Sequence, residues 1–269
     1  MKAKLQKLLD VNFIYPIFDS KWVSPLVMVP KKNEKWRICV DYRELYKSTQ
    51  KDHFPLPFID QVLDTLAGKK FFSFLDGFSG YNQIQIALED QDKTTFTCPW
   101  GTFSYKVLPF GLCKAPATFQ KAILSIFSDL INEGFKVYMD DFTPYGDDFE
   151  LAQDTLEKVL QRCISTRLCL SHEKCYMMMI EGLILGHYIL ATGIQVDPAK
   201  IQIILLIPTP TTQIKVCSFL RFSGYYRRFI EHFSQVATPL YALTGNVDFI
   251  WTDKCDHAFE DLKKLVLTT

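Results

Sequence analysis

Helical and strand-like patterns of apolar residues alternate along most of the chain. Short apolar runs such as "KKFFSFLD", "FKVYM" and "FTPYG" predict strands. Strands and helices that mix without a doubly wound series favour an α+β fold. After residue 212 helices are expected to dominate to the end. Before that point, apolar residues recur at helical spacing in residues 2–14, 54–68, 115–131 and 149–166.

Two adjacent aspartates, Asp140 and Asp141, stand between two strand-like runs in "VYMDDFTPYG". Adjacent carboxylates repel and aspartate is a poor strand former, so the pair is either a plain turn or a compensated site. We expect a hairpin with both aspartates at its tip, and Asp76 at the end of a neighbouring strand. Converging carboxylates of this kind suit Mg²⁺, and two such ions can assist phosphoryl transfer.

Composition narrows the class of protein. The 269 residues are 48% apolar and 22% charged, which indicates one large or two smaller globular domains rather than a disordered chain. The formal net charge of zero excludes a strongly basic global field, so nucleic-acid binding would need local patches. Residues 31–51 hold seven basic and three acidic side chains, which suits either a phosphate-facing surface or a solvated strand and turn.

The eight cysteines form no C-x-x-C pair. Cys169, His172 and Cys175 come nearest to a metal pattern, but reduced, packed thiols are the favoured interpretation. The amphipathic start of the chain has no apolar signal region, and the longest apolar stretch is interrupted by Glu181 and His187. We expect an intracellular protein, cytoplasmic or nuclear, without a membrane-spanning segment. These patterns specify no oligomeric state.

Five motifs, in chain order, resemble those of reverse transcriptases. "VYMDD" is similar to their Tyr-x-Asp-Asp motif, and "FFSFLDGFSGYNQI" resembles the segment with their first catalytic aspartate. "KTTFTCPWGTF" and "FSGYYRRFI" most resemble gypsy-type long-terminal-repeat retrotransposons, especially those of plant genomes. The remaining motifs resemble the fingers strand with its following helix, the helix beside the incoming nucleotide, and the primer-grip hairpin: "WRICVDYRELYKSTQKDHFPLPFIDQVLDTLAG", "LPFGLCKAPATFQ" and "LGHYIL".

The resemblance implies a right-hand polymerase fold. Residues 1–194 would form its fingers and palm, 195–245 a thumb or connection segment, and 246–269 a truncated start of an RNase H-like domain. Because the acidic ribonuclease residues would lie beyond that start, we expect no ribonuclease H activity from this chain. The fingers would take residues 1–55 and 84–114, and the palm residues 56–83 and 115–194.

The resemblance also implies roles for individual residues. Tyr81 would exclude the 2′-hydroxyl of ribonucleotides, and Lys174 would protonate the leaving pyrophosphate; packing in the core and a plain surface lysine are the alternatives. His187 is open to a structural role as well. The implied catalytic and metal-binding residues are Asp76, Asp140 and Asp141, with two Mg²⁺ ions or Mn²⁺ in their place. The implied substrate-binding residues are Lys32, Arg37, Tyr81, Phe110, Gly111 and Lys174, and the primer-binding residues are Gly186 and His187.

The implied function is RNA-directed DNA polymerisation. Deoxynucleoside triphosphates would be added to a primer on an RNA or DNA template by two-metal phosphoryl transfer. The alternative is a folded, inactive relic that at most binds nucleic acid, and a metal-independent structural protein ranks last. Pro144, Arg221 and the truncated end motivate the relic. Pro144 falls inside the returning strand of the hairpin, and Arg221 replaces an expected glycine, where an obligatory positive φ would strain arginine. Tyr46, which stands where the family usually has an asparagine, is a further departure.

Overall fold

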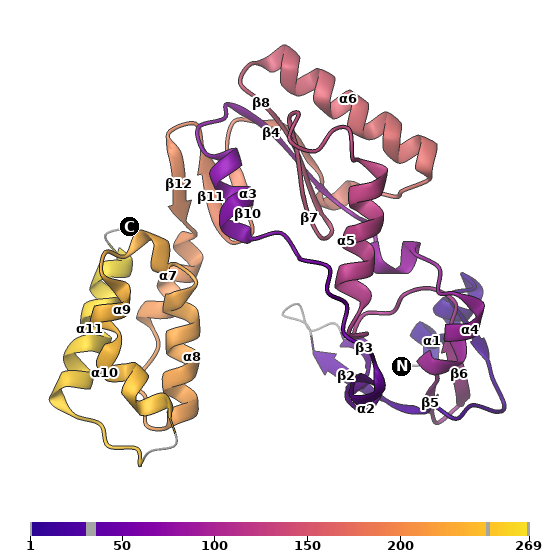
Figure 1. Ribbon diagram of the computed structural model, residues 1–269, viewed down its shortest axis with the longest axis horizontal. Coiled ribbons are helices and arrows are strands. Elements are labelled where there is room, and N and C mark those ends of the chain that lie inside the picture. The colour runs from indigo at the N-terminus through magenta and orange to yellow at the C-terminus, as the bar shows by residue number, and fades with distance from the viewer. Residues whose placement is uncertain (1, 31–35, 246–247, 268–269) are drawn as a thin grey trace. The chain divides into compact units, whose positions relative to one another are not determined.

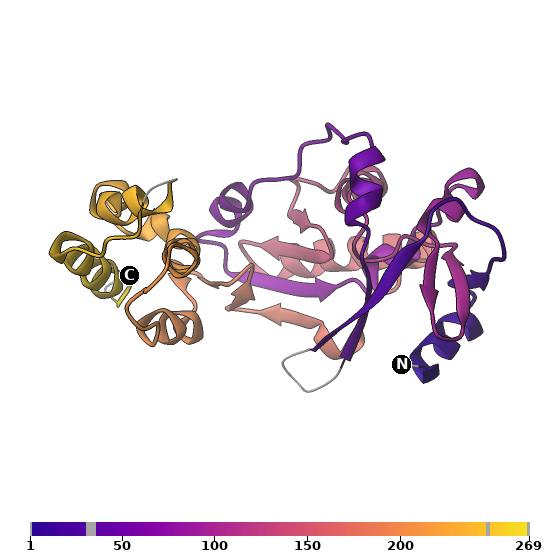
Figure 2. The ribbon, with the colours of Figure 1, turned by 90° about the horizontal axis from the view of Figure 1, so that it is seen from below.

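The computed structural model describes residues 2–30, 36–245 and 248–267 (Figures 1 and 2). Its contacts divide the chain into two compact units, Met1–Ile180 and Glu181–Thr269. Each contains its own apolar core. Across the described residues, every helix is too short or too polar to cross a bilayer.

The first unit contains two sheets (Figure 1). The five-stranded sheet has the order β1-β6-β5-β2-β3, and the four-stranded sheet has the order β7-β8-β4-β9. All pairs are antiparallel except β2 with β5. The strands of the first sheet are β1 Ile14–Pro16, β2 Ser24–Pro30, β3 Trp36–Val40, β5 Phe96–Cys98 and β6 Gly101–Tyr105. Those of the second are β4 Phe71–Asp76, β7 Phe135–Tyr138, β8 Asp141–Gly146 and β9 Tyr176–Met179.

The helices of the first unit follow the predicted periodicity closely. Helix α6, Phe149–Thr166, occupies the predicted range; Asp148 caps its start by accepting the Leu151 N–H at 2.8 Å, and Arg167 at φ +58° ends it. The other helices are α1 Lys2–Asp10, α2 Arg43–Ser48, α3 Ile59–Leu66, α4 Leu88–Gln91 and α5 Ala115–Ile126, with 3₁₀ turns η1 Gly80–Gln83, η2 Asp92–Thr94 and η3 His172–Lys174.

One core fixes the four-stranded sheet against α5 and α6. Phe119 from α5, Phe127 directly after α5 and Val159 from α6 are fully buried against Phe135 and Phe142 of the hairpin. Fully burying one such side chain contributes roughly 1.5–3 kcal/mol, so this cluster holds the hairpin firmly. Both helices therefore cover the same face of the sheet.

Strand β8 lies in the interior of its sheet, yet it contains the buried Pro144. The pairing with β7 is continuous, and Tyr145 N–H donates to Gly134 O at 2.7 Å. Alternation then directs the backbone of residue 144 toward β4, where proline offers no N–H. Among these described strands, the pairs between β4 and β8 accordingly stop at Phe72↔Tyr145 and resume at Leu75↔Phe142. The register is the same on both sides, so the ladder is interrupted over two register pairs and the hairpin is not shifted.

Glycine at position 146 lets β8 meet α6 closely. A Cβ at Gly146 would lie 2.6 Å from Ala152 N and 2.9 Å from Ala152 Cα. Such a distance to backbone atoms would force the helix away from the sheet. The join between β8 and α6 therefore depends on the absence of a side chain here.

The second unit has a three-stranded sheet, β10-β11-β12, and a helical core. Phe219 of α8 and Phe259 of α11 form a central ring pair with centroids 4.5 Å apart. Arg221 lies inside α8 with an exposed side chain and no positive φ, so arginine is not strained at this position. The elements are β10 Gly182–Ile184, β11 His187–Leu190, β12 Gly193–Val196, α7 Pro198–Leu205, α8 Gln213–Gly224, η4 Arg227–Phe229, α9 Phe233–Val236, α10 Thr238–Tyr241, η5 Ala242–Thr244 and α11 Asp253–Leu267.

The boundary between the units falls inside the range that the sequence assigned to the palm, 115–194. Strands β10 to β12 belong by their contacts to the second unit, together with α11 from the stretch expected to open an RNase H-like domain. The assignments of fingers, palm, thumb and RNase H-like segment stay predictions.

We predict that Gly134→Ala destabilises the first unit by about 2–3 kcal/mol. Gly134 has φ +93°, and an added Cβ would lie 2.9 Å from Thr155 Oγ1 and 3.1 Å from Tyr145 O. Urea unfolding checks this result, with Gly245→Ala as the control, because Gly245 has φ −82° and no atom within 4 Å of an added Cβ. Equal stabilities of the two variants would contradict the prediction.

Candidate active site

The tip of the β7–β8 hairpin is a two-residue loop made of Met139 and Asp140. The last pair of the ladder is Tyr138↔Asp141, and Met139 has φ +54°. The expectation that both aspartates occupy the tip is therefore wrong by one residue, because Asp141 already pairs as the first residue of β8. Two-residue loops match the right-handed twist of the strands, which favours this register.

Asp76 and Asp141 are register partners on adjacent strands, β4 and β8. The Gly77 N–H, immediately after β4, donates to Asp140 O at 2.9 Å and ties the loop to that strand. The structure thus brings Asp76, Asp140 and Asp141 together at one end of the four-stranded sheet.

The Asp141 carboxyl group ionises less readily than a free aspartate. Burial, and then the charges of Asp140 and Asp76, raise the pKa of Asp141 to about 6, while Lys174 opposes the shift. Lys174 lies on η3, and its Nζ is 3.0 Å from both carboxylate oxygens of Asp76. One lysine therefore offsets part of the charge of three aspartates.

Gln120, on α5, supports the hairpin loop. The sequence did not indicate it as a residue of the site. Its side chain is fully buried, and its Oε1 accepts the Met139 N–H at 2.8 Å. Its amide nitrogen has no hydrogen-bond partner among the described residues. A polar residue on the buried stripe Ala117, Gln120, Ile123 was the available signal in the sequence.

Gly80 gives the loop its space on the other side. A Cβ at Gly80 would lie 3.3 Å from the Asp140 Cβ and 3.2 Å from the Phe119 ring. The next residue, Tyr81, donates from its hydroxyl toward Met139 Sδ at 3.9 Å, and its ring contacts Phe119 edge-on at 5.3 Å. Tyr81 is thus half-buried. Its ring packs against the core residue Phe119 and also lines the cleft that opens beside Asp140.

A cleft of about 670 Å³ opens beside Asp140. Its lining includes Tyr81, Phe110 and Lys174 of the predicted substrate-binding set, and also Lys4 and Lys7 from α1. The Phe110 ring is exposed and lies 6.1 Å from the Tyr81 ring. Lysines 4 and 7 carry no motif, which is why the sequence did not point to them.

The loop after Phe110 is fixed by backbone conformation and by Tyr46. Gly111 has φ +111°, and a Cβ there would lie 3.4 Å from Val40 O. The Tyr46 hydroxyl donates to Gly111 O, so this departure from the family pattern makes a contact of its own. Tyr46 comes from α2, which follows strand β3 of the five-stranded sheet.

Two further predicted residues lie wholly or partly outside the described structure. Lys32 falls in the segment 31–35, outside the described residues. Arg37 has its backbone in β3, paired with Val29, and its side chain is outside the description.

Gly186 and His187 belong to the second unit. Leu185 at φ +47° and Gly186 at φ +69° form the loop between β10 and β11. The Tyr225 hydroxyl donates to Leu185 O at 2.6 Å and the Tyr226 hydroxyl donates to Gly186 O at 3.0 Å. The buried His187 ring has its Nδ1 2.8 Å from Leu185 O and packs against both tyrosine rings. These contacts favour the structural role that the sequence left open for His187.

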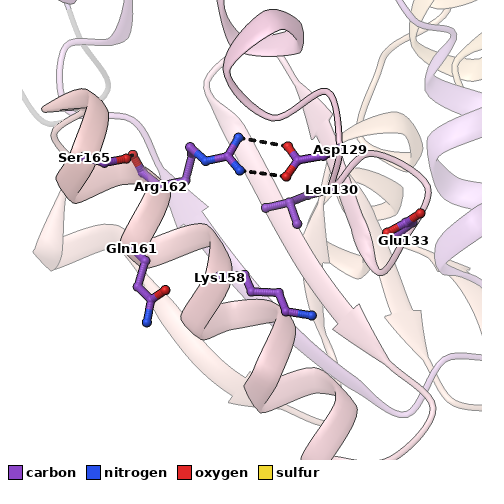
Figure 3. A pocket seen from close by; sticks show the side chains of 7 residues that line it. All are labelled: Asp129, Leu130, Glu133, Lys158, Gln161, Arg162 and Ser165. Atoms are coloured by element: carbon purple, nitrogen blue, oxygen red, sulfur yellow. Dashed lines mark hydrogen bonds and ion pairs between the residues drawn. The ribbon is translucent and has the colours of Figure 1, made fainter.

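A second pocket, of about 520 Å³, lies beside α6 (Figure 3). Arg162 and Asp129 face each other across it and form two hydrogen bonds of 2.9 and 2.7 Å. The same guanidinium also donates to Ile126 O. These partners neutralise one another, which leaves the cleft at Asp140 as the candidate active site.

No ready-made metal cage is present in the described part of the chain. There, no group of three or more His, Cys, Asp and Glu side chains is arranged to hold one ion, Cys169, His172 and Cys175 included. All eight cysteines are free thiols.

Two mainly antiparallel sheets, with Asp76, Asp140 and Asp141 close together beside a cleft, agree with the arrangement expected of a polymerase. Residues 29–220 match the family "Reverse transcriptase (RNA-dependent DNA polymerase)". The chain belongs to the reverse transcriptase family.

Its relatives include retrotransposon polyproteins. The chain is 36% identical over 274 residues to the retrovirus-related Pol polyprotein from transposon 412 of Drosophila melanogaster, covering 99% of this chain and 22% of that protein. It is 33% identical over 243 residues to the corresponding polyprotein from transposon gypsy of the same fly, covering 88% of this chain and 23% of that protein. The chain thus spans about a quarter of these relatives. The resemblance to gypsy-type elements is confirmed, and the narrower one to plant elements stays a prediction.

Solved structures show the same fold. A foamy viral protease-reverse transcriptase in complex with double-stranded DNA is 25% identical, with a TM-score of 0.89, covering 98% of this chain and 48% of that one. The foamy viral protein in complex with an RNA/DNA hybrid is 24% identical, with a TM-score of 0.88, covering 99% of this chain and 36% of that one. The right-hand polymerase fold expected from the sequence is confirmed.

We predict that Asp141→Asn stabilises the metal-free protein above about pH 6 and that the gain shrinks toward pH 4. The folded-state pKa of Asp141 lies at about 6, above the ordinary 3.8, so ionisation costs folding free energy fully above pH 6 and progressively less as pH falls. With allowance for partial exposure the gain is about 1–2 kcal/mol.

Thermal unfolding in EDTA at a series of pH values measures this gain. Asp154→Asn on α6 is the control, because Asp154 is exposed and lies outside the cleft. A difference between Asp141→Asn and wild type that does not change with pH would contradict the prediction.

Proposed function

We propose that this chain is the RNA-directed DNA polymerase module of a long-terminal-repeat retrotransposon. The observation that carries the proposal is the meeting of Asp76, Asp140 and Asp141 at one sheet end, beside a cleft, in a member of the reverse transcriptase family. The module would add deoxynucleotides to the 3′ end of a primer.

The carboxylate set suits two Mg²⁺ ions, or Mn²⁺ in their place. Its donors are hard oxygen ligands, and Mg²⁺ needs only one or two carboxylates when substrate phosphates supply the rest. Burial, and then the charges of Asp140 and Asp76, raise the pKa of Asp141, and bound cations would relieve the repulsion among these charges. Asp76 and Asp140 would hold the ions, with Asp141 in support. Bound there, the ions would neutralise charge on the attacking and leaving oxygens.

The side chains of the cleft would bind and orient the nucleotide. Tyr81 would meet the 2′ position of the sugar, and Phe110 and Gly111 would pack against nucleotide and template. Once Lys174 is released from its contact with Asp76, its Nζ would donate a proton to the leaving pyrophosphate. Lys32 and Arg37 would clamp the triphosphate through charge-assisted hydrogen bonds.

Template and primer would be held mainly by their phosphates, so base sequence should matter little. Solved relatives of the same fold contain double-stranded DNA or an RNA/DNA hybrid, which supports a duplex partner for this chain. In the second unit, Gly186 and His187 would position the primer strand. Their loop is held by two tyrosine hydroxyls, as a positioning element requires.

Primer extension on an RNA template with a DNA primer tests the proposal. We predict extension that requires Mg²⁺ or Mn²⁺ and falls by at least about 100-fold in Asp140→Asn, because a metal ligand contributes several kcal/mol to the transition state. Asp154→Asn is the matched control on exposed α6.

Absence of extension by folded protein that still binds the duplex would refute the active polymerase and leave the inactive relic. Pro144→Val then locates the cause, because valine returns the missing backbone donor to β8. Extension by that variant would show that the proline at this position blocks activity.

We further predict that Tyr81→Ala raises ribonucleotide use relative to deoxynucleotide use by about tenfold or more. The tyrosine ring lines the cleft, and its loss would remove the group that meets the 2′-hydroxyl. Competing the two substrates in a single-nucleotide extension measures the ratio, with Phe78→Ala as control, since Phe78 is exposed outside the cleft lining. An unchanged ratio would assign Tyr81 to packing alone.

A further inference from the structure

Two lysines of the first helix, Lys4 and Lys7, line the same cleft as Asp140, Tyr81 and Lys174. They are three residues apart on α1, which places them on one face of the helix. No motif of the sequence and no role in the proposed mechanism accounts for them.

Helix α1 is held in place against the core of the five-stranded sheet. Leu5 is buried, and Leu8 and Leu9 pack on the cluster that contains Ile14 and Tyr105. Both views show the helix beside the hairpin of β5 and β6 (Figures 1 and 2). Because the apolar face of α1 is packed on this core, the face that contains Lys4 and Lys7 has a fixed direction.

The end of α1 is equally well defined. Phe13 N–H donates to Leu8 O and Asn12 N–H donates to Leu9 O, both at 2.9 Å, with Asn12 at φ +58°. This left-handed cap stops the helix and leads directly into β1. The lysines therefore project from a fixed support and not from a loose chain end.

The α1 side of the cleft is basic. Lys4 and Lys7 line it, whereas Lys174 lies on the carboxylate side near Asp140 and is paired with Asp76. Within the described residues, neither Lys4 nor Lys7 takes part in an ion pair, and both are exposed. In a chain with a formal net charge of zero, two such ammonium groups in one cleft suit an anionic ligand.

We propose that Lys4 and Lys7 form a phosphate-binding site on the α1 side of the cleft, a site that rests on the proposed polymerase function. The ligand is a phosphate group, either of the template–primer backbone or of the incoming nucleoside triphosphate. Lysine binds phosphate as a point charge, so the contact is independent of base sequence.

The test compares the double variant Lys4→Gln/Lys7→Gln with Lys2→Gln/Lys158→Gln, which removes the same charge from exposed positions outside the cleft. The duplex is RNA/DNA with a 5′ template overhang and a dideoxy-terminated primer. Duplex affinity is measured over a salt series, and nucleotide affinity by titration of the enzyme–duplex complex. Both experiments measure binding, so they test the proposal even if the chain does not extend primers.

If the site binds the template–primer backbone, the slope of log duplex affinity against log salt concentration flattens by about 1–2 in the double variant, and nucleotide affinity is unchanged. Triphosphate binding predicts about tenfold weaker nucleotide affinity with an unchanged slope. Either result supports the site and names its ligand. Slope and nucleotide affinity equal to those of the control variant, at equal thermal stability, would overturn the proposal.

Discussion

Repulsion among three carboxylates is the constraint on which the candidate site depends. Asp76 and Asp141 pair across two strands and Asp140 stands in the loop beside them, so their charges cannot separate without breaking the sheet. The surrounding structure works against this repulsion. Lys174 bonds both oxygens of Asp76, the backbone of Gly77 holds the Asp140 carbonyl, and buried packing of α5 and α6 fixes the hairpin.

The local features of this arrangement could be predicted from the sequence. Helix α6 was predicted over its observed range because its apolar period is contained within its own 18 residues, and the aspartate that caps it stands immediately before them. The hairpin was predicted for the same reason. Its tip was misplaced by one residue because the pairing of Tyr138 with Asp141 is set by twist and by β4, neither of which shows in the spacing of apolar residues.

The rest of the site depends on contacts between distant residues, which no local pattern reveals. Gln120 is 19 positions from Met139, and the tyrosine hydroxyls of 225 and 226 each reach a carbonyl 40 positions away. Lys4 and Lys7 reach the cleft only because the apolar face of α1 docks on a sheet formed by later strands. The motifs indicated the candidate catalytic residues, and the fold was needed to find the residues that support them.

The close approach of Gly146 to Ala152 has a consequence for how copies of this coding sequence decay. Mobile elements accumulate substitutions once selection on them ends, and the aspartates alone report only on chemistry. Because no side chain fits between the end of β8 and the first turns of α6, a copy with any residue other than glycine at position 146 must lose this docking. Position 146 therefore records the loss of the contact between β8 and α6 separately from the loss of the candidate catalytic aspartates, and reading both in a set of copies orders the two events.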